Sequence, residues 1–116
     1  MIVLFLDDSE RRISIAEEYF ADDTFLAAQT SYTAIEYLRL AEEPFDLVML
    51  DHDLGGVVFQ NSKEENCGME VVRYIERTRP QIKKIIVHSW NVPAGQEMLA
   101  RLQNAGYEVS YEPFSH

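Results

Sequence analysis

The stretch Met1-Ile-Val-Leu-Phe-Leu-Asp-Asp8 places a short apolar run directly before two carboxylates. The run over residues 3–6 is short enough for a strand buried on both faces. The stretch lacks a basic region, so we expect a first strand here rather than a signal peptide. Four later segments have a similar apolar character and predict further strands: residues 24–28, 45–50, 83–88 and 107–111.

Helical patterns fill the intervals between these strands. Ser9 is a suitable N-cap for a helix reaching about residue 20, and Thr30 or Ser31 for a second helix that ends before Pro44. Residues 68–79 form a third helix, and residues 93–105 a fourth. The residues expected on the buried helix faces are Ile13, Ala16, Tyr19, Phe20, Ala34, Ile35, Leu38, Ala41, Val71, Val72 and Ile75.

The alternation of strands and helices is typical of a parallel sheet with helices on both faces. A chain of 116 residues has the length of one domain. We therefore expect a single α/β domain over residues 1–116, with a doubly wound sheet in three layers. Ligands of such sheets bind beyond the carboxyl ends of the strands.

The segment over residues 52–67 interrupts this alternation. It contains Gly55-Gly56 and a polar run over residues 60–66. A connection of this length without regular structure indicates a lid, a binding loop or disorder. Within it, Val57-Val58-Phe59 is expected to form either a short strand or an apolar anchor.

The composition excludes several classes of protein. Hydrophobic residues make up 47% of the chain and charged residues 26%, which excludes a disordered polypeptide. A net charge of −10 argues against long contacts with nucleic acid, but a small phosphorylated ligand stays compatible if a divalent cation supplies positive charge. No apolar run approaches the roughly 20 residues of a membrane span. Cys67 is the single cysteine, so no internal disulfide forms, which fits the reducing cytoplasm.

Carboxylates gather at the predicted strand ends. Asp7 and Asp8 follow the first strand, and Asp51 and Asp53 follow the third, which is its neighbour in a doubly wound sheet. Crowding like charges is unfavourable without a cation, and carboxylate oxygens suit Mg²⁺, Mn²⁺ or Ca²⁺. We expect a metal site that includes at least Asp8 and Asp51. The alternative is that Asp8 caps the first helix and Asp53 stabilises a turn.

Two histidines lie at the same strand ends. One interpretation is that His52 and His88 serve as a general base and acid on either side of a phosphate ester. A second is that they ligate a metal ion. The third is that one of them packs under the loop, is hydrogen-bonded and has no catalytic role. Beside them, Ser89 offers a hydroxyl and Asn91 an amide donor to a phosphate. Trp90 either stacks on a ligand ring or packs half-buried.

Three basic residues are near enough along the chain to bind a phosphate: Arg11, Arg12 and Lys63. Arginines on the first turn of a helix usually point into solvent. We therefore expect Arg11 and Arg12 to be solvated.

These residues resemble a response-regulator receiver domain over nearly the whole chain. Asp7-Asp8, Asp51 and Ser89 match that family's metal-binding acid pair, phosphoacceptor and switch hydroxyl. The resemblance implies a flavodoxin-like strand order of 2-1-3-4-5 and a bound Mg²⁺.

The chain also departs from the receiver pattern. Receivers carry a lysine before a proline after the fifth strand, where this chain has Glu112-Pro-Phe114. The loop over residues 52–67 is long, and no fifth helix follows the fifth strand. One flank of the sheet thus lacks its cover, and we expect either a second copy of the chain, in a homodimer, or the long loop to fill it.

Three segments resemble a divergent branch, the receiver-like family of cyclic-phosphate processing domains: Leu4-Phe-Leu-Asp-Asp8, His52-Asp-Leu-Gly55 and His88-Ser-Trp-Asn91. That resemblance implies a phosphoesterase acting on cyclic nucleotides or on RNA ends, with strand-end histidines beside the acid pair. The alternatives are an atypical receiver phosphorylated on Asp51 and a binding module without catalysis.

Overall fold

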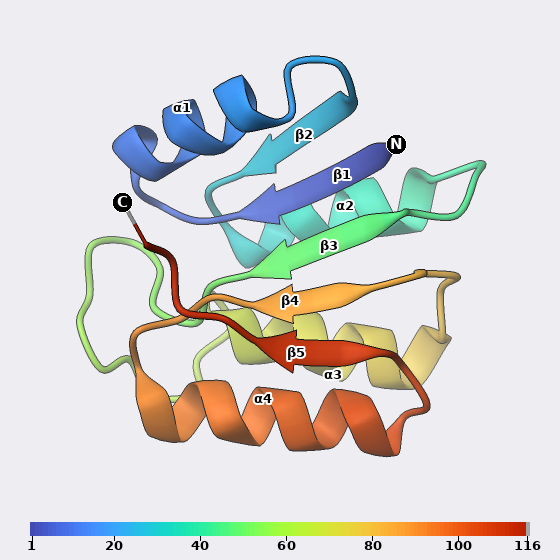
Figure 1. The fold of residues 1–116 in the computed structure, drawn as a ribbon. Coiled ribbons are helices and arrows are strands. Elements are labelled where there is room, and N and C mark those ends of the chain that lie inside the picture. Colours follow the sequence, from blue (N-terminus) through green and yellow to red (C-terminus); the bar gives the residue numbers. More distant parts are fainter. Residues whose placement is uncertain (116) are drawn as a thin grey trace.

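The computed structural model describes residues 1–115 and shows one five-stranded parallel sheet in the order β2-β1-β3-β4-β5 (Figure 1). The strands are β1 (Ile2–Leu6), β2 (Thr24–Ala28), β3 (Leu47–Leu50), β4 (Ile85–Val87) and β5 (Val109–Tyr111). The helices are α1 (Glu10–Tyr19), α2 (Ser31–Leu40), α3 (Gly68–Thr78) and α4 (Val92–Asn104). The predicted fold class and strand order are confirmed.

The two faces of the sheet carry cores of unequal size. Successive side chains of a strand point to opposite faces. Accordingly, Leu4 and Val48 join the large core under α2, α3 and α4. Val3 and Leu47 join a smaller one with Phe20, which follows α1. Each central strand is buried on both faces, so it forms from a continuous apolar run.

Predicted element ends differ from the observed ones by up to two residues. Strand β3 begins at Leu47, although Phe45 forms an isolated parallel bridge with Ile82 two residues earlier. Helix α1 has Ser9 as its N-cap, with Oγ accepting the Arg12 N–H at 3.2 Å. An isolated bridge therefore lies just before β3 and an N-cap just before α1, and neither counts as part of the element.

Two predicted core positions are wrong. Tyr19 is 82% exposed, because α1 buries Ala16 and Phe20, four residues apart, and Tyr19 lies beside that stripe. Ala41 is exposed because α2 ends one residue before it and the chain turns away.

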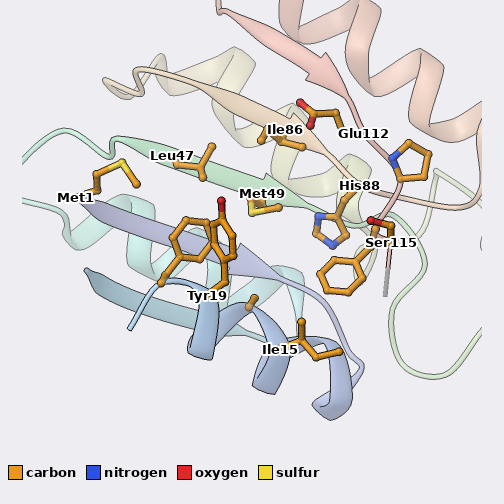
Figure 2. A pocket seen from close by; sticks show the side chains of 13 residues that line it. Met1, Ile15, Tyr19, Leu47, Met49, Ile86, His88, Glu112 and Ser115 are labelled. Carbon is orange, nitrogen blue, oxygen red and sulfur yellow. The ribbon is translucent and has the colours of Figure 1, made fainter. Parts of the chain in front are cut away.

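The flank that lacks a fifth helix contains a groove of about 530 Å³ (Figure 2). Its lining is mainly apolar and includes Met1, Ile15, Tyr19, Met49 and Ile86. Within residues 1–115 no helix follows β5, as the sequence predicts. That a second copy covers this groove stays a prediction. None of the four helices in the described chain has the length and apolar character needed to cross a membrane.

Candidate functional site

A cavity of about 380 Å³ lies at the carboxyl ends of the strands. All strands end at the same edge of the sheet, next to the loop that follows β3 (Figure 1). The lining comes from the ends of β1, β3 and β4, from α1 and from this loop: Asp8, Arg12, Asp51, Asp53, Gly56, Val57, Val58, Phe59, Trp90 and Asn91. The predicted location of the site is therefore where the structure has an acidic cavity.

Asp7 lies fully buried behind the cavity. Its Oδ1 accepts the Ser9 N–H at 2.9 Å, and its Oδ2 lies 3.1 Å from His88 Nε2 and 3.2 Å from Arg12 Nη1. Burial alone raises the pKa of Asp7, but these hydrogen bonds and the Arg12 charge outweigh it and hold the pKa below its usual range. Asp7 is therefore ionised at neutral pH.

Asp51 has the opposite protonation behaviour. It is 4% exposed, and its Oδ1 accepts the His52 N–H at 2.8 Å. Burial, followed by the nearby charge of Asp7, raises the pKa of Asp51 to about 8. Two neighbouring buried carboxylates thus cannot both ionise easily unless more positive charge is supplied.

Asp7, Asp51 and His88 form a group that could hold a metal ion, since one ligand atom from each lies within 4.8 Å of the others. Two carboxylates suit Mg²⁺ or Mn²⁺, and an imidazole nitrogen favours Mn²⁺ over Mg²⁺. The raised pKa of Asp51 also fits, because a bound divalent cation would favour the ionised form. The donor set therefore fits a divalent cation.

Asp8 and Asp53 lie nearby with their carboxylates bound to the loop. Asp8 Oδ2 accepts the Gly56 N–H at 2.7 Å, and Ser9, not Asp8, caps α1. Asp53 holds four hydrogen bonds at 2.7–3.1 Å, from His52 Nδ1, Phe59 N, Gln60 N and Asn91 Nδ2. Asp53 thus stabilises the turn, as one alternative predicts, while metal ligation by Asp8 and Asp53 stays a prediction.

The two histidines have different neighbours. His52 places Nδ1 2.7 Å from Asp53 Oδ1 and Nε2 2.9 Å from Ser62 Oγ. Burial lowers the pKa of His52, but contacts with Cys67 and Asp53 raise it above its ordinary value.

His88 stacks on Phe5, with ring centroids 4.9 Å apart, and burial lowers its pKa. Its Nδ1 has no hydrogen-bond partner within the described chain. Both imidazoles are fully buried, and neither lines the cavity described above. The structure therefore does not place them on either side of one ligand, and their catalytic roles stay predictions.

Ser89 and Asn91 lie just before α4. Ser89 is 1% exposed, and its Oγ accepts the Asn91 N–H at 3.0 Å. Asn91 caps α4 through Oδ1, which accepts the Ala94 N–H at 3.3 Å, and it lines the cavity. Asn91 thus lies where a ligand would contact it, whereas the Ser89 hydroxyl is engaged inside. Phosphate binding by either residue stays a prediction.

Glu112 is exposed and lines the apolar groove, not the cavity. Its Oε2 accepts the Ser110 hydroxyl at 2.6 Å. The carboxylate that replaces the receiver lysine is therefore directed away from the acidic site.

The prediction that Arg12 is solvated is wrong. Its guanidinium Nη1 lies 3.2 Å from Asp7 Oδ2 and 3.6 Å from Asp51 Oδ2, because the buried acid pair attracts the nearest cation. Arg11, one residue earlier, and Lys63 in the loop are exposed. Trp90 is 55% exposed on the cavity wall, and its Nε1–H donates to the Phe114 carbonyl at 2.9 Å.

The loop over residues 52–67 forms one wall of the cavity and is tied down by side chains that the sequence analysis missed. The Gln60 amide accepts the Leu54 N–H at 2.9 Å and donates to the Asn66 carbonyl at 2.5 Å. Arg73 from α3 donates to the Ser62 carbonyl at 2.7 Å. No sequence pattern used above identifies these hydrogen bonds, which join residues 6 to 11 positions apart.

Val57, Val58 and Phe59 form neither the strand nor the anchor expected for them. All three are exposed, with Val58 and Phe59 more than two-thirds exposed. Asp8 accepts the Gly56 N–H before this segment and Asp53 accepts the Gln60 N–H after it, and the segment lines the cavity.

Gly68 positions the end of β3 and was also missed. It begins α3, and its N–H donates to the His52 carbonyl at 2.9 Å. A Cβ at this position would lie 1.9 Å from the Asp51 carbonyl oxygen. A glycine directly after a long loop and at the start of a helix is the signal that could have indicated this close approach.

Comparison with solved structures supports the fold. The signal receiver domain of a Luxo repressor protein from Vibrio parahaemolyticus is 18% identical, with a TM-score of 0.66, covering 97% of this chain and 78% of that chain. The receiver domain of the Francisella response regulator 1452 is 14% identical, with a TM-score of 0.62, covering 97% of this chain and 84% of that chain. At these identities the likeness concerns the fold alone.

Comparison with protein families identifies the branch. A search of curated proteins gives no significant match. The family model described as the cyclic-phosphate processing receiver domain matches residues 2–104, nearly the whole α/β sheet and its acidic edge. The chain therefore belongs to the family of cyclic-phosphate processing receiver domains.

Proposed function

We propose that this domain binds a small phosphorylated molecule in the acidic cavity and opens a cyclic phosphate ester there with a divalent cation, Mg²⁺ or Mn²⁺. The observation that carries the proposal is the buried pair of Asp7 and Asp51 beside a cavity of about 380 Å³. A negative ligand binds at such a place only when a cation intervenes. The family description supports the cyclic phosphate as substrate class.

Asp7, Asp51 and His88 would hold the cation. Bound there, it would neutralise the phosphate oxygens and make the phosphorus more electrophilic. Burial keeps His88 neutral, which is the form that binds metals. Phe5 and Asp7 fix the orientation of its ring.

His52 is the residue we propose to move the proton. When Nδ1–H donates to Asp53 at 2.7 Å, Nε2 is left as the basic nitrogen, which accepts the Ser62 hydroxyl at 2.9 Å. Water adds to phosphorus and one ring P–O bond breaks; the proton passes from the water to His52 Nε2 and then to the leaving oxygen. Because the His52 ring is buried outside the cavity, ligand binding must also release Nε2 from Ser62 and turn the ring toward the cavity.

The test is phosphorus NMR of the protein with Mg²⁺, a 2′,3′-cyclic nucleotide and acetyl phosphate in one sample. The wild type is expected to convert the cyclic signal into a monoester. His52→Gln is expected to slow this conversion by about 10²–10⁴-fold, because it removes the proton carrier. His88→Gln is expected to weaken Mg²⁺ binding and thereby turnover.

The control is Glu17→Gln, which neutralises an exposed carboxylate on α1 and is expected to react like the wild type. Thermal melting of each variant shows whether it is folded. Wild-type rates in both histidine variants would exclude the proposed roles. Consumption of acetyl phosphate alone, abolished in Asp51→Asn, would favour a receiver phosphorylated on Asp51.

A further inference from the structure

Arg12 occupies a central place between the acid pair and the cavity. Its side chain is 25% exposed, and Nη1 lies 3.2 Å from Asp7 Oδ2 and 3.6 Å from Asp51 Oδ2. An arginine on the first turn of a surface helix keeps its guanidinium in water unless a nearby negative charge attracts it. The guanidinium is therefore the counter-ion of the Asp7–Asp51 pair.

The charges around Arg12 are unbalanced. Within residues 1–115, it is the one lysine or arginine that lines the cavity, against the carboxylates of Asp8, Asp51 and Asp53. One guanidinium faces two buried carboxylates, at 3.2 Å from Asp7 and 3.6 Å from Asp51. The pair is thus incompletely neutralised by Arg12.

A divalent cation and the Arg12 guanidinium compete for the same oxygens. The two carboxylates within 3.6 Å of Nη1 belong to the group that could hold a metal. A doubly charged ion bound there would repel a guanidinium at this distance. Metal binding therefore requires Nη1 to move away from Asp7 and Asp51.

Trp90 offers the displaced guanidinium a second place. The Arg12 guanidinium carbon already lies 5.6 Å from the centre of the Trp90 ring, within the range of a cation–π contact. Both side chains line the cavity. A guanidinium held against this wall can point its N–H groups at a phosphate, which it binds with two parallel hydrogen bonds.

We propose that Arg12 exchanges partners: it neutralises the Asp7–Asp51 pair before a divalent cation binds, and afterwards it binds the phosphate of the ligand while resting on Trp90. This inference builds on the proposed function, because it names the protein group that recognises the phosphate of the substrate. It makes Arg12 responsible for two opposite effects, one on metal affinity and one on phosphate affinity.

The experiment measures the binding of Mn²⁺, and of inorganic phosphate at saturating Mn²⁺, by calorimetry at one pH. Arg12→Gln is expected to bind Mn²⁺ at least about tenfold more tightly than the wild type, because the competing charge is gone. The same variant is expected to bind phosphate at least about tenfold more weakly, since a charged bidentate donor is lost. Arg11→Gln removes the same charge from the exposed neighbouring residue and is expected to change neither constant appreciably.

Two further measurements separate exchange from a structural effect. Arg12→Lys keeps the charge without the planar fork, so its Mn²⁺ affinity is expected near that of the wild type and its phosphate affinity between the wild type and Arg12→Gln. Trp90 is the only tryptophan, so its fluorescence is expected to change on adding Mg²⁺, which does not itself quench, to the wild type but not to Arg12→Gln. A wild-type melting curve for Arg12→Gln confirms that it folds; if it does not, Arg12→Lys carries the test.

Each outcome decides the inference. If Arg12→Gln binds Mn²⁺ no more tightly than the wild type, or binds phosphate equally well, the exchange is wrong. If neither the wild type nor any variant binds Mn²⁺, the proposed metal site and the exchange both fail. If the exchange is observed but no cyclic ester is opened, the proposed reaction fails and the role of Arg12 in binding stands.

Discussion

Asp51→Asn is expected to stabilise the protein at pH 8 while abolishing its stabilisation by divalent cations. Burial and the charge of Asp7 raise the pKa of Asp51 from 3.8 to about 8, so the folded state binds this proton more tightly than the unfolded chain. This proton therefore stabilises the folded state fully below pH 3.8, the pKa of Asp51 in the unfolded chain. The stabilisation is lost as the pH rises to about 8, the pKa of Asp51 in the folded protein. Asparagine has the same shape and no charge to ionise. The free energy of unfolding is expected to increase at pH 8 by roughly 2–5 kcal/mol, and the melting temperature by about 10 °C or more.

The measurement is thermal melting between pH 4 and pH 8, with and without Mn²⁺. The wild type is expected to lose stability as the pH rises and to regain it on adding Mn²⁺, until a chelator removes the metal. Asp51→Asn is expected to show a flatter curve and no effect of Mn²⁺, because one of three ligands is missing. Glu17→Gln is the control, since it neutralises an exposed carboxylate that does not line the cavity. A variant no more stable than the wild type at pH 8 would contradict the proposed repulsion.

Gly68→Ala is expected to destabilise the fold by about 4 kcal/mol or more, which is exceptional for a single added methyl group. The new Cβ would lie 1.9 Å from the Asp51 carbonyl oxygen and 2.9 Å from the His52 Cα. Both contacts are with backbone, so α3 or the end of β3 must move. Since this movement displaces Asp51, Mn²⁺ affinity is expected to fall with stability.

Urea unfolding monitored by circular dichroism measures this cost, and Gly56→Ala is the matched control. Gly56 has a φ of +76°, but a Cβ added there would meet no atom of the described residues within 4 Å. Alanine at this position is therefore expected to cost only about 1–2 kcal/mol of backbone strain. Equal effects of the two substitutions would show that the close approach of α3 to Asp51 is not rigid.

Much of the fold follows from local sequence patterns. Apolar runs such as residues 3–6 are buried on both faces of the sheet, and the caps Ser9 and Thr30 begin α1 and α2 as expected. Positions at the ends of helices were less predictable. Tyr19 is the last residue of α1 and lies beside the buried stripe of Ala16 and Phe20, so it is exposed although Phe20 next to it is buried.

Strand positions in the sequence were enough to predict which residues meet at the acidic edge of the sheet, because parallel strands bring their carboxyl ends together wherever they lie in the chain. Asp7, Asp51 and Asn91 could be placed there from strand positions alone. The hydrogen bonds, ion pairs and pKa shifts of these groups, in contrast, follow from the packing of the whole chain. The orientation of the Arg12 side chain and the raised pKa of Asp51 depend on distances between residues far apart in sequence. Burial strengthens these electrostatic interactions, and no local sequence pattern indicates it.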